Sequence, residues 1–293
     1  MTNFAVALEA KALLGECPRW HPTENKLYWV DIDKGELHRL DPQSGADEVM
    51  SLGAPIGCFA FTDGGGFLLA MKDGFSFLER WGGKPRPFGE QIFRDRSDLR
   101  FNDGRTDSHG RFWVGSVNMD KSAHDAALYR LEGNGSITMA DSGMLTCNGA
   151  AFSPDQRCFY HSDTPTHLLC RYDYDVANGH LGPRKPFHGF PEGKGRPDGG
   201  SVDAEGCYWV ALFDGGRVVR ISPDGDIVES VNLPVSRPTM ITLGGPDLRT
   251  AYVTTARKGL SDEALLSQPL AGAIFSFPVA TPGLKEQPFD YRG

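Results

Sequence analysis

Short runs of aromatic and β-branched residues alternate with polar and glycine-rich turns along the whole chain. One such run recurs six times, at residues 27–31, 67–71, 112–115, 158–162, 207–211 and 250–254. A turn precedes each run and a second alternating run follows it, at 36–40, 75–78, 127–131, 168–172, 218–221 and 273–277. Runs of this length and composition, bounded by turn residues, predict β-strands.

The six copies are separated by steps of 40 to 49 residues. This spacing is typical of a propeller blade made of four strands. One blade cannot bury both faces of its sheet, whereas a closed ring of blades can, and a β-sandwich would not produce six equivalent units. The sequence therefore predicts an all-β, six-bladed β-propeller with four antiparallel strands per blade, formed by residues 1–293 as one domain. Residues 256–266 interrupt the pattern and predict a short helix capped by Ser261.

Polar side chains crowd into residues 98–107, directly ahead of one of these strands. Arg100, Asn102 and Asp103 stand there beside a glycine. Polar groups held on a short loop against a rigid strand are typical of binding sites. An Asx turn, in which Asn102 and Asp103 bond their own backbone, is the alternative for this segment taken alone.

Similar residues recur at matching places in other blades. Glu16, Asn102, Asn148 and Asp198 each lie ten to twelve residues before the first aromatic residue of a recurring strand, namely Tyr28, Phe112, Phe159 and Tyr208. Turn preferences explain each residue alone but not the recurrence. Because the innermost strands of a propeller line its channel, we expect the four side chains to meet near the axis, with the adjacent glycines letting the backbone approach a ligand.

The oxygen-bearing side chains of Glu16, Asn148 and Asp198 suit a hard or borderline divalent cation, with waters completing the shell. Ca²⁺ is the first expectation, and Mg²⁺, Mn²⁺, Fe²⁺ and Zn²⁺ are alternatives. Histidine is absent from these positions, which argues against the usual zinc triads. Asp120 lies on a loop that could fold over the channel mouth, or it is simply a solvated carboxylate.

Composition excludes several classes of function. The 293 residues carry a net charge of −8 with scattered Lys and Arg, so nucleic acid is not an expected partner. No apolar run approaches the roughly 20 residues of a membrane span. The N-terminal segment lacks the features of a signal peptide, and six widely spaced cysteines are expected to be reduced thiols, so we expect a cytoplasmic protein.

Five short motifs carry a resemblance to a known family. They are Leu-Gly-Glu-Cys-Pro at 14–18, Arg-Phe-Asn-Asp-Gly at 100–104, Cys-Asn-Gly at 147–149, Arg-Pro-Asp-Gly at 196–199 and Gly-Pro-Asp-Leu at 245–248. Together they resemble the SMP-30/gluconolactonase/luciferin-regenerating family of six-bladed sugar-lactone hydrolases. The segment 254–257 is most similar to the bacterial sugar-acid lactonases of that family.

The resemblance implies roles for individual residues. It implies metal ligation by Glu16, Asn148 and Asp198, with Asp198 also acting as general base, and substrate or water contacts from Arg100 and Asn102.

The sequence departs from the family pattern at two positions. Cys17 replaces the glycine usual after the glutamate. Asp120 stands where animal members have a substrate-contacting glutamate, one methylene longer, which bears on substrate preference.

We therefore expect metal-dependent hydrolysis of an aldonolactone, such as a glucono-, xylono-, arabinono- or galactonolactone, to its sugar acid in carbohydrate catabolism. A metal-dependent esterase or phosphotriesterase on the same propeller is the main alternative, followed by a non-catalytic binding propeller. The expected partner is a small-molecule sugar lactone, with no nucleic acid or membrane, and the protein is expected to be a monomer or small homo-oligomer.

Overall fold

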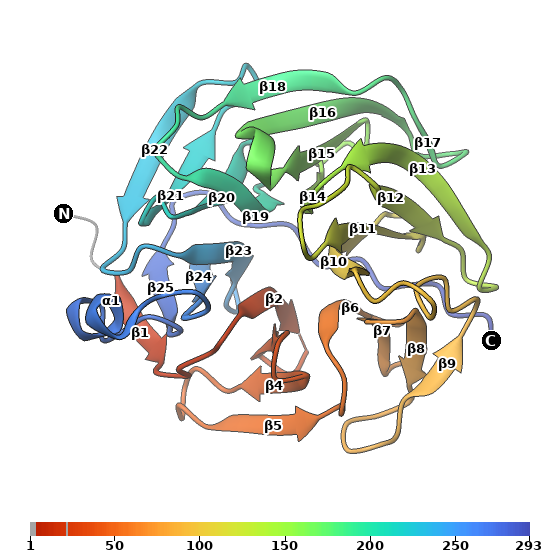
Figure 1. The fold of residues 1–293 in the computed structure, drawn as a ribbon, viewed down its shortest axis with the longest axis horizontal. Helices are drawn as coiled ribbons and strands as arrows, with labels where there is room; N and C mark the ends of the chain where they lie inside the picture. The colour runs from red at the N-terminus through yellow and green to blue at the C-terminus, as the bar shows by residue number, and fades with distance from the viewer. Residues whose placement is uncertain (1–3, 22) are drawn as a thin grey trace.

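Six antiparallel sheets form a ring around a central axis (Figure 1). The computed structural model describes residues 4–21 and 23–293. Residues 1–3, part of the N-terminal segment, and Pro22, expected in the turn before the first recurring run, lie outside the described residues. The expected six-bladed β-propeller is confirmed, with β2, β6, β10, β14, β19 and β23 as the innermost strands.

Each of the first three blades is a continuous stretch of chain. Blade one consists of β2 (Gly15–His21), β3 (Lys26–Asp31), β4 (Glu36–Leu40) and β5 (Asp47–Ser51). Blade two consists of β6 (Ile56–Phe61), β7 (Phe67–Met71), β8 (Phe75–Leu78) and β9 (Arg86–Phe88). Blade three consists of β10 (Leu99–Thr106), β11 (Phe112–Asn118), β12 (Ala126–Leu131) and β13 (Ile137–Met144).

The remaining blades depart slightly from this plan. Blade four has β14 (Cys147–Phe152), β15 (Cys158–Asp163) and β16 (Leu168–Asp175), with β17 (His180–Leu181) and β18 (Lys185–Gly189) both paired to β16. Blade five consists of β19 (Arg196–Val202), β20 (Tyr208–Phe213), β21 (Arg217–Ile221) and β22 (Ile227–Asn232). Blade six has β23 (Pro238–Gly244), β24 (Thr250–Thr255), β25 (Ile274–Pro278) and, at its edge, β1 (Ala5–Leu8). The ring is therefore closed by pairing the first strand of the chain with the last.

The recurring runs in the sequence are the second and third strands of the blades. The short helix is also present, as α1 (Asp262–Ser267), and the Ser261 hydroxyl accepts a hydrogen bond from Ala264 N at 3.2 Å. A single 3₁₀ turn, η1 (Thr164–Thr166), joins β15 to β16. The six cysteines are free thiols, as expected. Within the described part of the chain, no helix is long and apolar enough to cross a membrane.

The prediction of a loop at residues 98–107 was wrong. Most of this segment is strand β10, the innermost strand of blade three. Its polar composition has a physical reason: an innermost strand faces the channel as well as its neighbouring blades, so it is not restricted to apolar side chains. The turn expected after it, at 108–110, is present.

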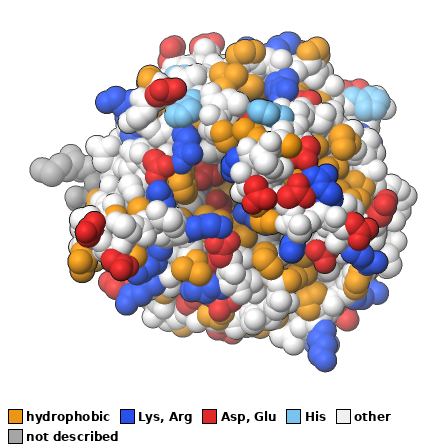
Figure 2. Space-filling view, viewed as in Figure 1, with side chains coloured by type: hydrophobic (Ala, Val, Ile, Leu, Met, Phe, Trp, Pro, Cys, Tyr) orange, Lys and Arg blue, Asp and Glu red, His pale blue; other side chains and the backbone are white. Residues whose placement is uncertain are grey.

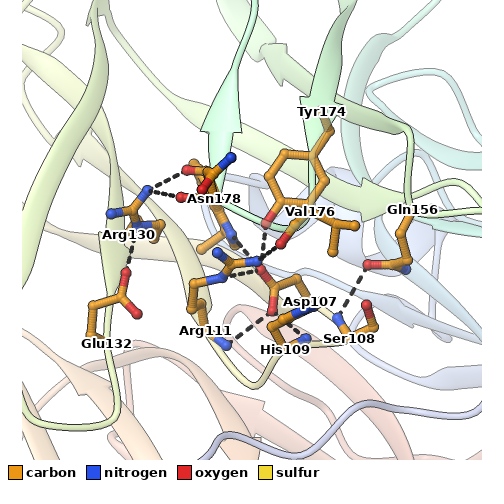
Figure 3. A network of polar contacts seen from close by, with 12 residues as sticks. Asp107, Ser108, His109, Arg111, Arg130, Glu132, Gln156, Tyr174, Val176 and Asn178 are labelled. Atoms are coloured by element: carbon orange, nitrogen blue, oxygen red, sulfur yellow. Dashed lines mark hydrogen bonds and ion pairs between the residues drawn. The ribbon is translucent and has the colours of Figure 1, made fainter.

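Apolar side chains fill the spaces between blades. Trp113 of blade three, for example, packs against Phe152 and Phe159 of blade four within one buried cluster. At the rim of the same two blades, the buried Asp107 accepts hydrogen bonds from Arg111 Nε at 2.7 Å and from the Tyr174 hydroxyl (Figure 3). Apolar packing and buried polar contacts thus both join neighbouring blades.

Residues 279–293 cross one end of the channel. Gly283 and Phe289 form isolated β-bridges with Asp203 and Thr62, and Asp290 N donates to Gly110 O at 3.0 Å. These partners lie at turns where innermost strands end. The end of the channel where the innermost strands begin is therefore the one left for a site.

Candidate active site

Each of the six innermost strands has a break in its pairing with the second strand. The breaks fall between Glu16 and Arg19, Ile56 and Cys58, Phe101 and Gly104, Asn148 and Ala151, Pro197 and Gly200, and Pro238 and Met240. A β-bulge of this kind bends the strand and re-aims a side chain. The four recurring polar residues lie at the edge of these breaks or inside them, which explains their matching spacing in the sequence.

The structure brings five of the six predicted site residues together. Glu16, Arg100, Asn102, Asn148 and Asp198 line one cavity of about 280 Å³. All five side chains belong to residues that are buried. They come from blades one, three, four and five, so the cavity lies on the propeller axis, where those blades meet.

A chain of hydrogen bonds orients the amide side chains. Arg100 Nη1 donates to Asn102 Oδ1 at 2.8 Å, and Asn102 Nδ2 donates to Asn148 Oδ1 at 2.6 Å. Asn148 Nδ2 in turn donates to the Thr164 hydroxyl at 2.7 Å, which donates to Pro197 O at 2.8 Å. Because the amide nitrogen of Asn148 is engaged by Thr164, its oxygen is directed to the side of Asn102.

Glu16 and Asp198 are buried carboxylates, and neither has an ion-pair partner among residues 4–21 and 23–293. Burial raises the pKa of Glu16 well above its usual value, and the negative charges of Asp198 and Asp103 raise it further. Burial and the charge of Asp103 likewise raise the pKa of Asp198. Burying two like charges without compensation is unfavourable. A divalent cation between them would remove that cost.

The donor chemistry fits such an ion. Two carboxylates and the amide oxygen of Asn148 form an all-oxygen set, which hard divalent cations prefer. Among the described residues, no three or more His, Cys, Asp or Glu side chains cluster closely enough to hold a metal by themselves. The set identified here contains only two acids, because its third member is an asparagine.

Two aspartates missed by the sequence analysis hold the strands that carry the site. The Asp31 carboxylate accepts from Leu13 N at 2.8 Å and Leu14 N at 3.1 Å, just before Glu16. Asp163 accepts from Thr146 N at 2.8 Å, two residues before Asn148. Each aspartate ends the second strand of its blade. Their shared position was the signal that could have identified them.

A charged layer lies below the cavity. Asp103 Oδ2 accepts from Ala150 N at 3.0 Å, so the side chain bridges two blades, whereas the alternative of an Asx turn would have it bond its own segment. Arg19 Nη1 lies 2.8 Å from Glu286 of the C-terminal segment, which also pairs with Arg105. The charges of both arginines lower the pKa of Glu286, although its burial acts in the opposite direction. Nothing in the sequence around Glu286 indicated this position.

The glycines beside the site have a different role from the expected one. Gly149 has a φ of 67°, and a Cβ atom there would lie 2.3 Å from the Tyr208 hydroxyl. A Cβ atom on Gly199 would lie 2.4 Å from the side chain of Met240. Protein atoms of the next blade therefore occupy the space that these two glycines leave. The glycines permit close packing, and the proposed approach of a ligand to the backbone is not what requires them.

Asp120 is exposed and is not among the residues that line the cavity. Its neighbour Lys121 lines the cavity instead, together with Arg196 and Lys258. A substrate contact from Asp120 stays a prediction.

The comparisons with known proteins agree with this geometry. Residues 14–257 match the SMP-30/Gluconolactonase/LRE-like region. The chain belongs to this family. The match spans all five motifs noted in the sequence, and it includes every predicted site residue.

Relatives within the family are similar over almost their whole length. A 6-deoxy-6-sulfogluconolactonase of Pseudomonas putida is 42% identical over 282 residues, which cover 95% of each chain. A pentonolactonase of Haloferax volcanii is 35% identical over 301 residues, with 97% of each chain covered. The solved structure of regucalcin from Agrobacterium tumefaciens, described as a calcium-binding protein, has a TM-score of 0.94 at 28% identity, covering 98% of this chain and 97% of that one.

Proposed function

We propose that this member of the SMP-30/gluconolactonase family hydrolyses a sugar lactone to its sugar acid with the help of one divalent cation. The observation that carries the proposal is the meeting of two buried carboxylates without ion-pair partners in the described chain and an amide oxygen, from three blades, next to Arg100 and Asn102 in one cavity. The names of the relatives, a sulfogluconolactonase and a pentonolactonase, support the same class of substrate.

Glu16, Asn148 and Asp198 would hold the cation. When bound, a divalent cation supplies Lewis-acid polarisation of the lactone carbonyl and activates water as a nucleophile. Ca²⁺ is the first candidate, because a regucalcin of closely similar fold is described as calcium-binding. The other oxygen-preferring divalent ions stay as alternatives.

The side chains around that position carry out the remaining steps of the proposed reaction. Asp198 accepts the proton of the attacking water, a task that its raised pKa favours because the carboxylate is then more basic. The Arg100 guanidinium faces the oxyanion that develops on the carbonyl oxygen and stabilises it. Asn102, whose amide nitrogen donates to Cys147 O and to Asn148 Oδ1, would accept a hydrogen bond from a ring hydroxyl through its Oδ1.

The volume of the cavity limits the size of the substrate. Its volume of about 280 Å³ lies at the lower end of ligand pockets. One sugar ring of five or six members fits this class of cavity better than a bulky triester or a disaccharide. Cytoplasmic location, monomeric or small homo-oligomeric state and a substrate contact from Asp120 are further parts of the proposal.

Proton release against a panel of substrates tests this proposal. The panel contains glucono-, xylono-, arabinono- and galactonolactones, an aryl ester and a phosphotriester, each with Ca²⁺, Mg²⁺ or Mn²⁺ present. We expect acid production from at least one sugar lactone well above its spontaneous hydrolysis. Turnover of the aryl ester or the phosphotriester alone would contradict the lactonase and support the esterase alternative.

A further inference from the structure

Four basic side chains stand around the cavity that holds the proposed metal ligands. They are Arg100 and Lys121 of blade three, Arg196 of blade five and Lys258 of blade six. The face drawn in Figure 2 is hollowed at its centre, and Lys and Arg side chains border the hollow. Because the whole protein carries a net charge of −8, this concentration of positive charge is a local feature of the site.

The partners of these cations differ. Arg196 pairs with Asp214, and Lys258 Nζ lies 2.8 Å from the Asp33 carboxylate. Lys121 Nζ donates to the Thr146 hydroxyl at 2.5 Å, but no carboxylate of residues 4–21 and 23–293 lies within ion-pair distance of it. Lys121 is therefore a cation of the cavity rim that lacks an anionic partner within the described chain.

Two features make the position of Lys121 costly for the free protein. Its φ of 54° lies in the left-handed region, which side chains other than glycine rarely adopt. Partial desolvation of the amine and the positive charges of Arg100 and Arg196 lower the pKa of Lys121 to about 8, although the charges of Asp163 and Asp198 act in the opposite direction. A bound anion would offset the repulsion among the three cations.

The position of Lys121 relative to the metal ligands indicates which part of a substrate it would meet. Its hydrogen-bond partner Thr146 precedes Asn148 by two residues, at the start of β14. Lys121 itself belongs to the loop between β11 and β12, at the rim of the cavity. Because Lys121 lines the same cavity as Asp198 and Arg100, a substituent of a lactone bound between those two residues would lie in the same enclosure as the Lys121 amine.

We propose that Lys121, supported by Arg196, forms a subsite for an anionic substituent on the carbon of the lactone farthest from the carbonyl. The substituent would be a tetrahedral oxyanion, a sulfonate or a phosphate, which accepts charge-assisted hydrogen bonds from an ammonium and a guanidinium. The group is held and not transferred, so the reaction remains hydrolysis of the lactone ester. This inference rests on the proposed lactonase function and specifies its substrate class.

Equilibrium binding tests the subsite independently of turnover. Calorimetry with Ca²⁺ present compares gluconate, 6-phosphogluconate and 6-deoxy-6-sulfogluconate on the wild type, on Lys121→Met and on Lys121→Arg. Lys185→Met, which alters an exposed lysine paired with Asp173, is the matched control.

We expect the wild type and the control to bind at least one of the two acids that carry the additional anionic group about tenfold or more tightly than gluconate, since one charge-assisted hydrogen bond has this effect. Lys121→Met should lose this preference and Lys121→Arg should keep part of it. Preference for one of the two acids would identify the substituent as sulfonate or phosphate. Equal affinity for all three acids, or an unchanged preference in Lys121→Met, would overturn the subsite.

Kinetics separate this inference from the function on which it rests. The ratio of kcat/KM for gluconolactone 6-phosphate or 6-sulfonate to that for gluconolactone should fall about tenfold or more in Lys121→Met. Hydrolysis of both kinds of lactone at an unchanged ratio would overturn the subsite alone. Selective binding of an anionic acid without hydrolysis of any lactone would support the subsite and overturn the proposed reaction.

Discussion

In the proposed function, Asp198 has to meet two requirements that oppose each other. As a metal ligand its carboxylate should be ionised, while as a general base it should retain affinity for a proton. Burial and the negative charge of Asp103 raise its pKa, whereas the positive charge of Arg196 lowers it. A bound cation would act in the same direction as Arg196. Arg196 and a bound cation would favour the ionised form, while burial and Asp103 keep the carboxylate basic enough to accept a proton from water.

We expect Asp198→Asn to lower kcat for sugar lactones by about a hundredfold or more, because a positioned general base contributes a factor of this order. Asparagine keeps the shape and one oxygen of the side chain but cannot accept the proton. The measurement is the steady-state rate of acid release, with circular dichroism as the check on folding. Asp224→Asn, on an exposed turn, is the matched control. A folded Asp198→Asn variant with nearly wild-type kcat would show that another group is the base.

We expect the buried His161 to make the folded protein less stable at acid pH. Its side chain is buried, and burial lowers its pKa from 6.5 to about 4 in the folded protein, with the charge of Asp141 opposing and that of Arg184 adding to this effect. Between these pH values the unfolded chain binds the proton and the folded one does not, so stability falls as the pH falls. The expected contribution is about 3 kcal/mol, at about 1.4 kcal/mol per pH unit.

The free energy of unfolding, measured by denaturant titration from pH 7 to pH 4, checks this prediction. His161→Phe should flatten the slope relative to the wild type, and His124→Phe, at an exposed position, should not. Parallel slopes for wild type and His161→Phe would show that folding does not lower the pKa of His161.

The sequence identified those site residues whose type recurs at the same place in several blades. Glu16, Asn148 and Asp198 were identifiable because the same kind of residue returns at one place in several blades. Lys121 and Glu286 occupy positions without a counterpart elsewhere in the chain. Their importance comes from what lies across the channel from them, which only the folded arrangement shows.

The innermost strands illustrate both the success and the failure of reading strands from patterns. The second and third strands are buried on both faces between neighbouring blades, so their aromatic and β-branched runs identified them. Strand β10 instead carries Arg100, Asn102 and Asp103 across a bulge. Its composition resembles a loop, because the requirement to line a polar channel outweighs ordinary strand preferences.

Asp107 shows how one side chain joins two blades. Its carboxylate accepts from Arg111 Nε, Arg111 N and His109 N at 2.7, 3.0 and 2.8 Å, and from the Tyr174 hydroxyl of β16. Arg111 and Arg130 extend this network to the chain at Val176 and Asn178 (Figure 3). The contacts are therefore concentrated where blade three meets blade four.

We expect Asp107→Ala to lower the free energy of unfolding by about 3–5 kcal/mol, because it leaves the Arg111 cation buried without its partner. Urea unfolding measures this change. Asp173→Ala removes an exposed ion pair from strand β16, which also carries Tyr174. It should change stability little. Equal effects of the two substitutions would show that the Asp107 network adds no more than a surface contact.

The ring as a whole depends on contacts between distant parts of the chain. Strand β1 completes blade six by pairing with β25, and residues 279–293 cross the channel end opposite the site. The repeat length predicted six blades, but it carried no information about which segment completes the last one. Such pairings are set by ring closure, a property of the molecule and not of any local pattern.

A cation held by blades one, four and five should stabilise this ring. Because burial raises the pKa values of Glu16 and Asp198, the metal-free folded protein holds more protons than the unfolded chain above the ordinary carboxyl pKa. The contribution of these two carboxyl groups to stability therefore decreases as the pH rises, and a cation that displaces their protons offsets the loss. At a hundredfold excess over its Kd the ion contributes about 2.7 kcal/mol.

Thermal unfolding with and without a chelator measures this effect. The Tm should rise with added cation, more at pH 8 than at pH 5, and Glu16→Gln should reduce the increase. A Tm that is indifferent to cations at both pH values would argue against a metal site between the three blades.

The most direct test of the account is the activity of chelator-stripped protein toward its best sugar lactone, with Ca²⁺, Mg²⁺, Mn²⁺, Fe²⁺ and Zn²⁺ restored one at a time. We predict that the stripped protein is nearly inactive, that at least one ion restores acid release, and that Glu16→Gln requires more of that ion. Full activity in the stripped protein, unchanged by any of the ions, would contradict the proposal that Glu16, Asn148 and Asp198 form a metal-dependent lactonase site.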